Sequence, residues 1–426
     1  MEHQAVWAIV IFLLSYALLI SEKIHRTIVA MLGGLLVVLS GIVDQATVLR
    51  HIDFNTLGLL IGMMIIVSVT ADTGLFRFIA IWAAKRAKGK PVRIMVALTV
   101  ITAVGSAFLD NVTTVLLMVP VTFSITRQLR ITPIPFLMAE IIASNVGGTA
   151  TLIGDPPNIM IGSAVKELTF GAFIANLTPI VIIIMAAYIP LFVLLFRKQM
   201  RAEPERIRAI MELEQAGLIT DVKLLVKCLA VLGVTIAGFF LHQIIHAESA
   251  AIALSGAFIL LLLTGERHME EAFGKVEWMT IFFFIGLFSL VAGLVETGVI
   301  ADLAARAIEL TGGDVAATSM LILWLSAVAS AFLDNIPFVA TMIPMIQEMG
   351  NMGVDNLEPL WWSLALGACL GGNGTLIGAS ANLITAGLSA KEGYPIRFMA
   401  YMKIAFPLML LSIILSSAYV YVRYLM

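Results

Sequence analysis

The stretch Ser106-Ala-Phe-Leu-Asp-Asn111 recurs without change as Ser330-Ala-Phe-Leu-Asp-Asn335, 224 positions further along the chain. The same offset relates a series of further matches, namely Thr73-Gly74 with Thr297-Gly298, Pro120 with Pro344, Gly147-Gly148 with Gly371-Gly372, Thr151-Leu-Ile-Gly154 with Thr375-Leu-Ile-Gly378, and Asn158 with Asn382. One constant offset across separated matches indicates a duplicated half. Duplicated halves whose apolar segments are interrupted by glycine at corresponding places are typical of the binding site of a secondary transporter.

The composition indicates a polytopic membrane protein. Of 426 residues, 60% are hydrophobic and 13% are charged, whereas about 25% are charged in an ordinary soluble domain. The mean hydropathy is +1.01, and apolar runs of roughly 18 residues, enough to cross a bilayer, recur along the whole chain. No basic run interleaves with aromatic residues, so nucleic acid is not indicated as a partner. The two cysteines, Cys228 and Cys369, exclude a disulfide framework and a multi-cysteine metal site.

The apolar runs predict ten spans, five in each half. We place them at residues 5–20, 25–43, 54–73, 134–162, 171–196, 222–242, 247–264, 278–296, 358–388 and 398–424. The first run lacks a basic leader and a cleavage pattern, so we expect a retained span rather than a signal peptide. The predicted organisation is a first repeat at residues 1–196, a charged cytoplasmic linker at 197–221, and a second repeat at 222–426.

Two further apolar stretches, residues 94–126 and 317–346, each carry an Asp-Asn pair at the middle. Each is too short for two full crossings with a turn, so we expect re-entrant hairpins with their tips near the midplane of the membrane. Non-helical backbone at that depth is tolerated only where it is buried in protein or lines a wet cavity.

The placement of Lys and Arg predicts the orientation in the membrane. With both termini outside, 22 of the 26 basic residues fall on the cytoplasmic side, and only Arg50, Lys166, Arg306 and Arg423 fall outside. Five spans per half is an odd number, so the two halves are expected to insert with opposite orientation. The sequence therefore predicts an all-α protein of the cell membrane (the inner or plasma membrane) with two inverted-topology repeats, each holding a re-entrant hairpin and a glycine-broken helix.

The hairpin tips Asp110-Asn111 and Asp334-Asn335 place carboxylates in apolar surroundings. An intramembrane carboxylate costs roughly 2.5–3.5 kcal/mol on insertion scales, so a pair of them indicates a function such as exchange of a proton for a cation. The alternative is structural, because Asp and Asn are good N-caps for the helix that follows.

The broken helices supply the second group of candidate residues. The stretch from Ser144 to Asn158 contains three glycines and a proline pair, and its counterpart from Gly371 to Asn382 contains four glycines. Neither can be a continuous helix, and unwinding frees backbone carbonyls and a helix N-terminus that can bind ions or substrate. The alternative is a kink used for packing. The candidate binding residues are Ser106, Asp110, Asn111, Thr113, Gly148, Thr149, Thr151, Asp155, Asn158, Ser330, Asp334, Asn335, Asn373, Thr375 and Asn382.

Two acidic residues break the symmetry between the halves. Asp155 corresponds to Ala379, and Glu140 corresponds to Leu364. Because a substrate would meet both halves at once, one-sided acids are candidates for setting substrate preference. For Glu140 the alternative is a pair with a nearby base. The six histidines fall in loops or at span ends, and no His/Cys spacing indicates zinc.

The two motifs, Ser-Ala-Phe-Leu-Asp-Asn-Val-Thr-Thr-Val from Ser106 and Gly-Gly-Thr-Ala-Thr-Leu-Ile-Gly-Asp-Pro-Pro-Asn from Gly147, resemble the ArsB/NhaD permeases of the ion transporter superfamily, a group with citrate transporter-like domains, and are most similar to its P protein branch. The resemblance covers nearly the whole chain. It implies a homodimer that works by elevator-type alternating access. It also implies one ion site at 106–113 with 147–155 and another at 330–337 with 371–379.

The resulting hypothesis is a secondary active transporter, not an enzyme, that uses H⁺ or Na⁺ as coupling ion and no other cofactor. Arsenite or antimonite export and Na⁺/H⁺ antiport remain open, with possible Na⁺ sites at Asp110/Asn111 and Asp334/Asn335. An arsenite pump could also recruit an ATPase subunit. The acidic tips argue against an organic anion such as a di- or tricarboxylate, which remains an alternative. A gated ion channel and an intramembrane aspartyl protease using Asp110 and Asp334 are further alternatives.

Overall fold

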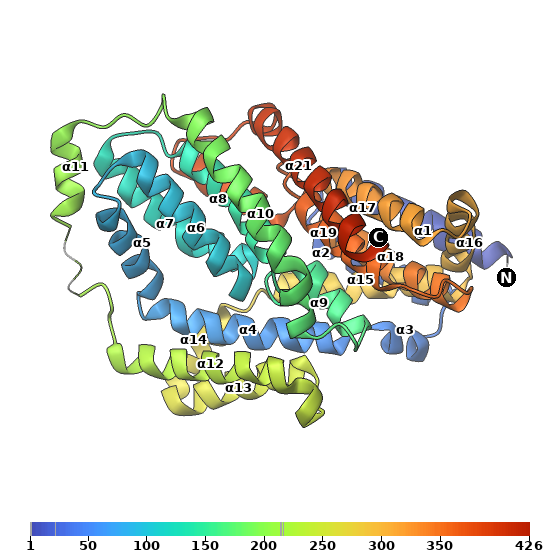
Figure 1. Ribbon diagram of the computed structural model, residues 1–426. Helices are drawn as coiled ribbons and strands as arrows, with labels where there is room; N and C mark the ends of the chain where they lie inside the picture. Colours follow the sequence, from blue (N-terminus) through green and yellow to red (C-terminus); the bar gives the residue numbers. More distant parts are fainter. Residues whose placement is uncertain (1, 22, 214, 216) are drawn as a thin grey trace.

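Figure 1 shows the computed structural model of the protein, which describes residues 2–21, 23–213, 215 and 217–426. The described residues form α-helices, one π-helical turn at the C-terminus and no strand. The predicted all-α fold class is therefore confirmed. Four positions of the predicted repeats and linker, residues 1, 22, 214 and 216, lie outside the described residues.

The helices follow one another through short connections. In the first half they are α1 (Glu2–Ser21), α2 (Arg26–Leu39), α3 (Gln45–His51), α4 (Phe54–Asp72), α5 (Leu75–Arg86), α6 (Pro91–Phe108), α7 (Asn111–Leu129), α8 (Ile134–Gly148), α9 (Pro156–Ala164) and α10 (Phe170–Phe196). The linker carries α11 (Pro204–Met211). The second half contains α12 (Val222–Ile245), α13 (Ser249–Thr264), α14 (Glu266–Gly274), α15 (Trp278–Glu296), α16 (Val299–Thr311), α17 (Val315–Phe332), α18 (Asn335–Asn351), α19 (Glu358–Gly371), α20 (Ser380–Lys391), α21 (Phe398–Val420) and the π-helical turn (Tyr421–Leu425).

The helix bounds repeat at the offset found in the sequence. α4 and α15 are both 19 residues long, and α4 maps onto α15 when 224 is added to each residue number. α6 and α17, both of 18 residues, correspond in the same way. The helices that follow them also begin at matching residues, Asn111 in α7 and Asn335 in α18. The two halves therefore share one order of elements, while their opposite orientation in the membrane stays a prediction.

The hairpin limbs are longer than the sequence analysis expects. α6 begins at Pro91 and α7 ends at Leu129, so the expected bounds 94–126 are too narrow. Proline suits the first turn of a helix because its missing N–H leaves no hydrogen bond unmade there. Limbs of 18 and 19 residues are long enough to cross a membrane, so shortness does not support re-entry, which stays a prediction.

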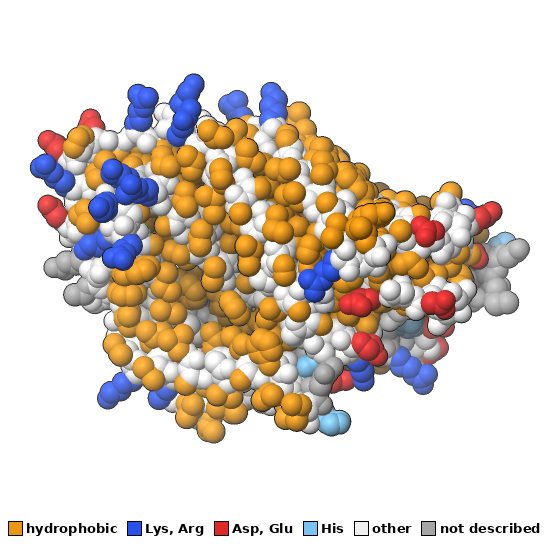
Figure 2. All heavy atoms as spheres, viewed as in Figure 1, with side chains coloured by type: hydrophobic (Ala, Val, Ile, Leu, Met, Phe, Trp, Pro, Cys, Tyr) orange, Lys and Arg blue, Asp and Glu red, His pale blue; other side chains and the backbone are white. Residues whose placement is uncertain are grey.

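The surface of the molecule is apolar over most of the face shown in Figure 2. Lys and Arg side chains gather mainly at the end that carries α5 and α11, and acidic side chains gather mainly at the opposite end. Among the described residues, nine helices are long and apolar enough to cross a membrane. Many of their large side chains point outward, as with Val234 of α12, which is 72% exposed, and Ile182 of α10, which is 62% exposed. The chain is a multi-pass membrane protein.

The two halves cross each other at paired glycines. Gly62 of α4 lies against the backbone of Ala253 in α13, where a Cβ would come within 2.6 Å of it. Gly286 of α15, the counterpart of Gly62, lies against Ala30 in α2, where a Cβ would come within 2.4 Å. Close approach of this kind is common between membrane helices with small residues at the contact. As a result, α2 packs on α15 and α13 packs on α4.

A second exchange between the halves surrounds the hairpins. Within each half, α6 packs on α8 and α17 packs on α19. Between the halves, α7 packs on α20 and α18 packs on α9, while α8 also meets α19. Each hairpin is therefore enclosed partly by the broken helix of its own half and partly by that of the other half.

Candidate functional site

The first hairpin turns at Leu109 and Asp110, between the end of α6 and the start of α7. Asp110 caps α7 by accepting a hydrogen bond from the backbone N–H of Thr113 at 2.8 Å. The second hairpin turns in the same way, with Asp334 accepting from the N–H of Ile336 at 3.1 Å. Both aspartates therefore cap the helix that follows them, as the structural alternative predicts. Capping does not prevent either carboxylate from making further contacts.

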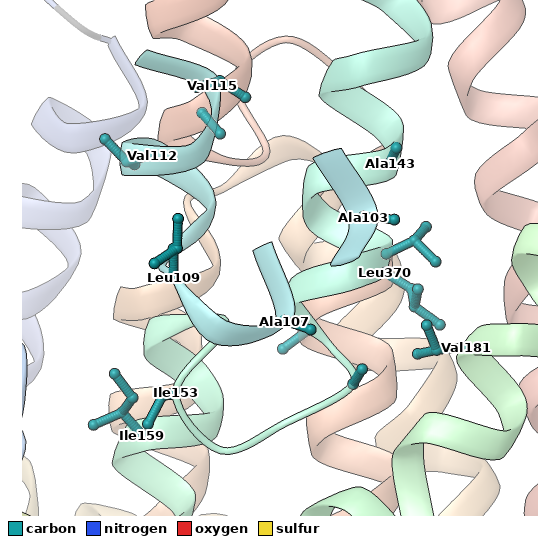
Figure 3. Close-up of a cluster of buried hydrophobic side chains, with 14 of the residues drawn as sticks. Ala103, Ala107, Leu109, Val112, Val115, Ala143, Ile153, Ile159, Val181 and Leu370 are labelled. Atoms are coloured by element: carbon teal, nitrogen blue, oxygen red, sulfur yellow. The ribbon is translucent and has the colours of Figure 1, made fainter. Parts of the chain in front are cut away.

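Apolar side chains hold the first hairpin tip against the broken segment that follows α8 (Figure 3). Ala107, Leu109 and Val112 of the tip are each 8% exposed or less, and Ile153 and Ile159 beside them are each 2% exposed. Because this packing excludes bulk water from the flanks of the tip, the polar groups at its centre meet protein rather than solvent.

Glycines let the backbone of each broken segment approach its hairpin. The helix is interrupted between Gly148 and Pro156, and α19 and α20 are interrupted at the corresponding place. A Cβ on Gly154 would come within 2.5 Å of the carbonyl oxygens of Gly148 and Ser106. Gly378, its counterpart, is confined by two carbonyl oxygens at 2.6 Å. Only a residue without a side chain fits at these two positions.

Hydroxyl groups attach each broken segment to its hairpin through matching bonds in the two halves. The donors are Ser106, Thr151, Ser330 and Thr375, and the acceptors are the carbonyl oxygens of Ser144, Ala107, Ala368 and Ala331 respectively. Asn158 donates to the carbonyl of Thr151 at 2.9 Å, and Asn382 donates to the carbonyl of Thr375 at 2.9 Å. These predicted residues therefore shape the broken segments, and their side chains use protein partners.

Asn145 of α8 joins the polar groups of the two halves. Its Oδ1 accepts a hydrogen bond from Nδ2 of Asn111 at 3.1 Å. Its Nδ2 donates to Oδ1 of Asn373 and to Oδ1 of Asn382, both at 2.9 Å. All four side chains are buried. The predicted residues Asn111, Asn373 and Asn382 are thus brought together by a side chain that the sequence analysis does not include among its candidates.

The tips of the two hairpins meet at a cavity of about 20 Å³. Its polar lining comes from Arg26, Asp110, Asn111, Asp155, Glu277, Thr280, Asn335 and Ser380. α4 adds Leu60 and Met64, and the hairpins add Val112 and Ile336. A space of this size holds about one water-sized occupant. In this conformation the cavity therefore fits a single small ion or a water molecule.

Asp155 brings a buried carboxylate without a counterion to this cavity. Its side chain is 0% exposed and precedes α9 at the N-cap position, yet it makes no capping hydrogen bond. Oδ1 accepts from Nδ2 of Asn335 at 3.3 Å, and Oδ2 has no hydrogen-bond partner among the described residues. A buried carboxylate is costly as a bare charge, so a proton or a cation is needed to neutralise it. The geometry leaves one oxygen open for such a ligand.

Asp334 differs from Asp110 because a basic side chain neutralises it. Arg26 Nη1 lies 2.7 Å from Asp334 Oδ2 and 2.5 Å from Ser380 Oγ. Ser380 Oγ in turn donates to Asp334 Oδ2 at 3.1 Å. The two side chains of the ion pair are 30% and 18% exposed. The two predicted ion sites are therefore unequal in charge.

The remaining candidates lie near the site without entering the cavity. The hydroxyl of Thr149 donates to the carbonyl of Asn145 at 2.8 Å within its own helix. Thr113 serves the cap of α7, and Gly148 lies at the end of α8. Glu140 accepts from the hydroxyl of Thr122 at 2.5 Å rather than from a base, so the predicted pairing with a base is wrong.

The sequence analysis misses six residues of the site, namely Arg26, Asn145, Glu277, Thr280, Cys369 and Ser380. Cys369 corresponds to Asn145, and its Sγ donates to Oδ1 of Asn158 at 3.5 Å, so two unlike residues hold equivalent amides. This pair could have been recognised in the sequence, because Asn145 and Cys369 are two different residues with hydrogen-bonding side chains at positions 224 residues apart. Glu277 carries a related signal, because its counterpart at this offset is the acidic residue Asp53, whereas Arg26 corresponds to Ala250 and carries none.

The donors at the cavity decide which ligand could bind. Within the described ranges, no group of three or more His, Cys, Asp or Glu side chains is placed to hold a metal ion. A cation here would be held by one carboxylate together with amide, hydroxyl or carbonyl oxygens. Oxygen ligands of this kind suit hard cations.

Comparison with known proteins identifies the family. A sequence model of CitMHS, described as citrate transporter, matches residues 16–367. The chain belongs to this family. The citrate transporter family is part of the ArsB/NhaD superfamily, so the relationship predicted from the two motifs is confirmed, and the protein is a membrane transporter of the CitMHS/ArsB-NhaD type.

Relatives of this CitMHS chain extend over its whole length. An uncharacterized transporter of Mycobacterium tuberculosis is 44% identical over 426 residues, covering 99% of both chains. The P protein of Homo sapiens is 36% identical over 505 residues, and this chain spans about 60% of its length. The crystal structure of the YdaH transporter of Alcanivorax borkumensis matches with a TM-score of 0.60 at 14% identity, covering 99% of this chain and 98% of that one. The similarity to the YdaH transporter is evidence for the fold alone.

Proposed function

We propose that the protein is a secondary active carrier that exchanges a small monovalent cation, Na⁺ in the first instance, for protons at the cavity between the hairpin tips. The observation that carries the proposal is Asp155, a fully buried carboxylate with one unpartnered oxygen. A group that must hold either a proton or a cation binds the two in turn, and competition for one carboxylate couples their movement in opposite directions.

The charges around the cavity favour a cation over an organic anion. Asp110, Asp155 and Glu277 all line it, while the one basic side chain in the lining, Arg26, already pairs with Asp334. A citrate-like substrate would meet these carboxylates and find no free basic partner in the lining. The space of about 20 Å³ is also too small for a tricarboxylate in this conformation. Membership of a family described as citrate transporter therefore does not by itself assign citrate to this chain.

An uncharged metalloid such as As(OH)₃ is the second candidate. It would bind through neutral donors and acceptors, and the site is rich in amides. Asn373 Nδ2 is a buried donor without a hydrogen-bond partner in the described part of the chain, which supports this alternative. The protease alternative gains no such support, since the structure gives Asp110 and Asp334 separate partners, Thr113 and Arg26.

The packing supports an elevator mechanism as part of the proposal. The cavity lies between two sets of helices, the interlocked hairpins and broken helices on one side and α4, α15 and α2 on the other. A movement of the first set along the second would carry the cavity across the membrane. Association of two copies of the chain, which the resemblance implies, is part of the same proposal.

Proton flux in proteoliposomes tests the function. Purified protein is reconstituted with an internal pH-sensitive dye, and gradients of Na⁺, Li⁺, arsenite or citrate are imposed separately. We expect Na⁺ or Li⁺ gradients to drive proton movement and citrate to drive none. A response to arsenite alone would identify the metalloid as the substrate. A response to citrate alone would overturn the cation proposal.

Two variants test whether the proton flux depends on the carboxylates of Asp155 and Asp110. Asp155→Asn removes the charge at similar volume and should reduce proton flux to the level of empty vesicles. Asp110→Asn should do the same while leaving the protein folded, because Asn caps a helix as well as Asp does. Thr385→Val is the control, since the Thr385 hydroxyl is buried without a partner on neighbouring α20. Full activity of Asp155→Asn would exclude Asp155 as the coupling residue.

A further inference from the structure

The two ion sites predicted at the hairpin tips are not equivalent in the structure. Among the residues that the structure describes, no basic side chain forms an ion pair with Asp110 at the first tip, whereas Asp334 at the second tip pairs with Arg26, which approaches from the start of α2. The residue that corresponds to Arg26 in the other half is Ala250, and the residue that corresponds to Ser380 is Pro156. Neither Ala250 nor Pro156 can supply a positive charge or a hydroxyl group to Asp110.

The guanidinium of Arg26 lies where a cation would bind Asp334. It contacts Asp334 Oδ2 at 2.7 Å and Ser380 Oγ at 2.5 Å, two oxygens that would otherwise be available as ligands. The ring of Phe283 lies beneath it, with its centroid 5.1 Å from the guanidinium carbon. This contact favours a cation at the same place. Three independent contacts thus hold one positive charge at the second tip.

Arg26 also lies between two cavities. It lines the cavity of about 20 Å³ between the tips, and it lines a larger, more open cavity of about 220 Å³ with Tyr16, Asp334 and Pro337. The hydroxyl of Tyr16 donates to the carbonyl of Pro337 at 2.6 Å, which ties α1 to the second hairpin beside the ion pair. Asp334 therefore faces the larger cavity together with Arg26.

We infer that in this conformation Arg26 is a built-in counter-cation that occupies the second ion site, so that the protein binds one transported cation per chain, at the Asp110 and Asp155 side of the cavity. This inference rests on the proposed function. It predicts a stoichiometry that differs from the two sites implied by the duplicated sequence.

Equilibrium binding of ²²Na⁺ to the purified chain in lipid nanodiscs tests the inference. The wild type should bind one Na⁺ per chain. Arg26→Gln removes the positive charge and should raise the number to two, while Arg26→Lys should keep it at one. The double variant Arg26→Gln with Asp334→Asn removes both charges and should return the number to one. Lys275→Gln, which breaks an ion pair with Asp72 at the helix ends, is the control and should also bind one.

The outcomes separate the inference from the proposed function. A wild type that binds two Na⁺, or an Arg26→Gln variant that still binds one, overturns the inference and leaves the cation carrier intact. A wild type that binds no Na⁺ overturns the proposed function and the inference with it. If Arg26→Gln fails to fold, Asp334→Asn alone decides: one Na⁺ in both it and the wild type supports the inference, and a fall from two to one contradicts it.

Discussion

Asn145 is the side chain through which the two halves exchange hydrogen bonds at the site. It accepts from Asn111 in its own half and donates to Asn373 and Asn382 in the other. In a buried network of this kind each group that loses its partner costs about 1–3 kcal/mol. The arrangement at Asn145 therefore stabilises the contact between halves and holds three candidate ligands in place.

Replacing Asn145 by alanine should destabilise the folded protein by at least about 3 kcal/mol, because it leaves three buried groups without partners at about 1 kcal/mol or more each. Thermal unfolding in detergent, followed by intrinsic fluorescence, measures the change. Cys369→Ala is the matched control at the corresponding position of the other half, and it should cost less because a thiol is a weak donor and its hydrogen bond to Asn158 is long at 3.5 Å. Equal losses of stability in the two variants would show that the hydrogen bonds of Asn145 contribute no more than packing does.

The roles of individual residues were predictable from the sequence only where a motif repeats. The pairs at the hairpin tips and the glycines of the broken helices stand out because they occur twice. Arg26 could not be found in that way, since its counterpart Ala250 is apolar and its partner Asp334 is 308 residues away. Asp155 was predicted, but its open oxygen was not, because Asp before Pro-Pro at a helix start would ordinarily cap that helix.

At the scale of elements, the broken helix is held open by steric limits rather than by weak helix propensity alone. Gly147 and Gly371 let α8 and α19 lie directly on the backbones of α6 and α17, where a Cβ would come within 2.1 Å and 2.5 Å of carbonyl oxygens. Sequence alone indicated the breaks and the long apolar helices, but α18 runs to Asn351 where the hairpin was expected to end at 346, and the short helices α3 and α14 were not expected. It could not indicate which backbone each glycine would meet, because those contacts are with other elements.

Gly154→Ala should abolish transport, because its Cβ would lie 2.5 Å from two carbonyl oxygens and would push the hairpin tip away from the broken segment. Overpacking of this kind typically costs about 1–3 kcal/mol, so the variant should still be expressed. Gly105→Ala in α6 is the control. A Cβ there meets only Thr114 Cγ2 at 3.6 Å, and alanine favours a helix interior by about 1 kcal/mol over glycine. Flux assays and melting temperatures should separate the two variants, and normal flux in Gly154→Ala would show that the tip can move without loss.

At the scale of the whole molecule, the order of helices and their membrane character follow from the sequence, whereas the exchange between halves does not. The hydrophobic pattern and the 224-residue offset indicate which segments are helices and which correspond. They do not indicate that α9 packs on α18 and α20 on α7, because equivalent surfaces could pair within a half as well as between halves.

A disulfide between the two sets of helices should stop an elevator movement. Asn55 of α4 and Ser163 of α9 are joined by a side-chain hydrogen bond of 2.9 Å, so the variant Asn55→Cys with Ser163→Cys should form a crosslink under oxidation. Transport should fall on oxidation and return on reduction, in a background where Cys228 and Cys369 are replaced by alanine. Arg127→Cys with Glu392→Cys, an exposed pair that joins α7 to α20 within one set, replaces two long side chains, so a short bis-methanethiosulfonate reagent is used to crosslink it, and transport should not be lost. Undiminished flux through the first crosslink would exclude sliding at this contact.

The interlocking of each hairpin with the opposite broken helix constrains how the protein is made. When the ribosome has finished the first half, the Nδ2 group of Asn145 still lacks the partners that Asn373 and Asn382 provide. The nascent first half must wait in the membrane with this buried donor unpaired until the chain has been inserted from residue 196 as far as Asn382. Two separately expressed halves should therefore be degraded when produced alone and should accumulate together when produced in the same cell, as would the two chains of an ancestral dimer from which a fused gene arose.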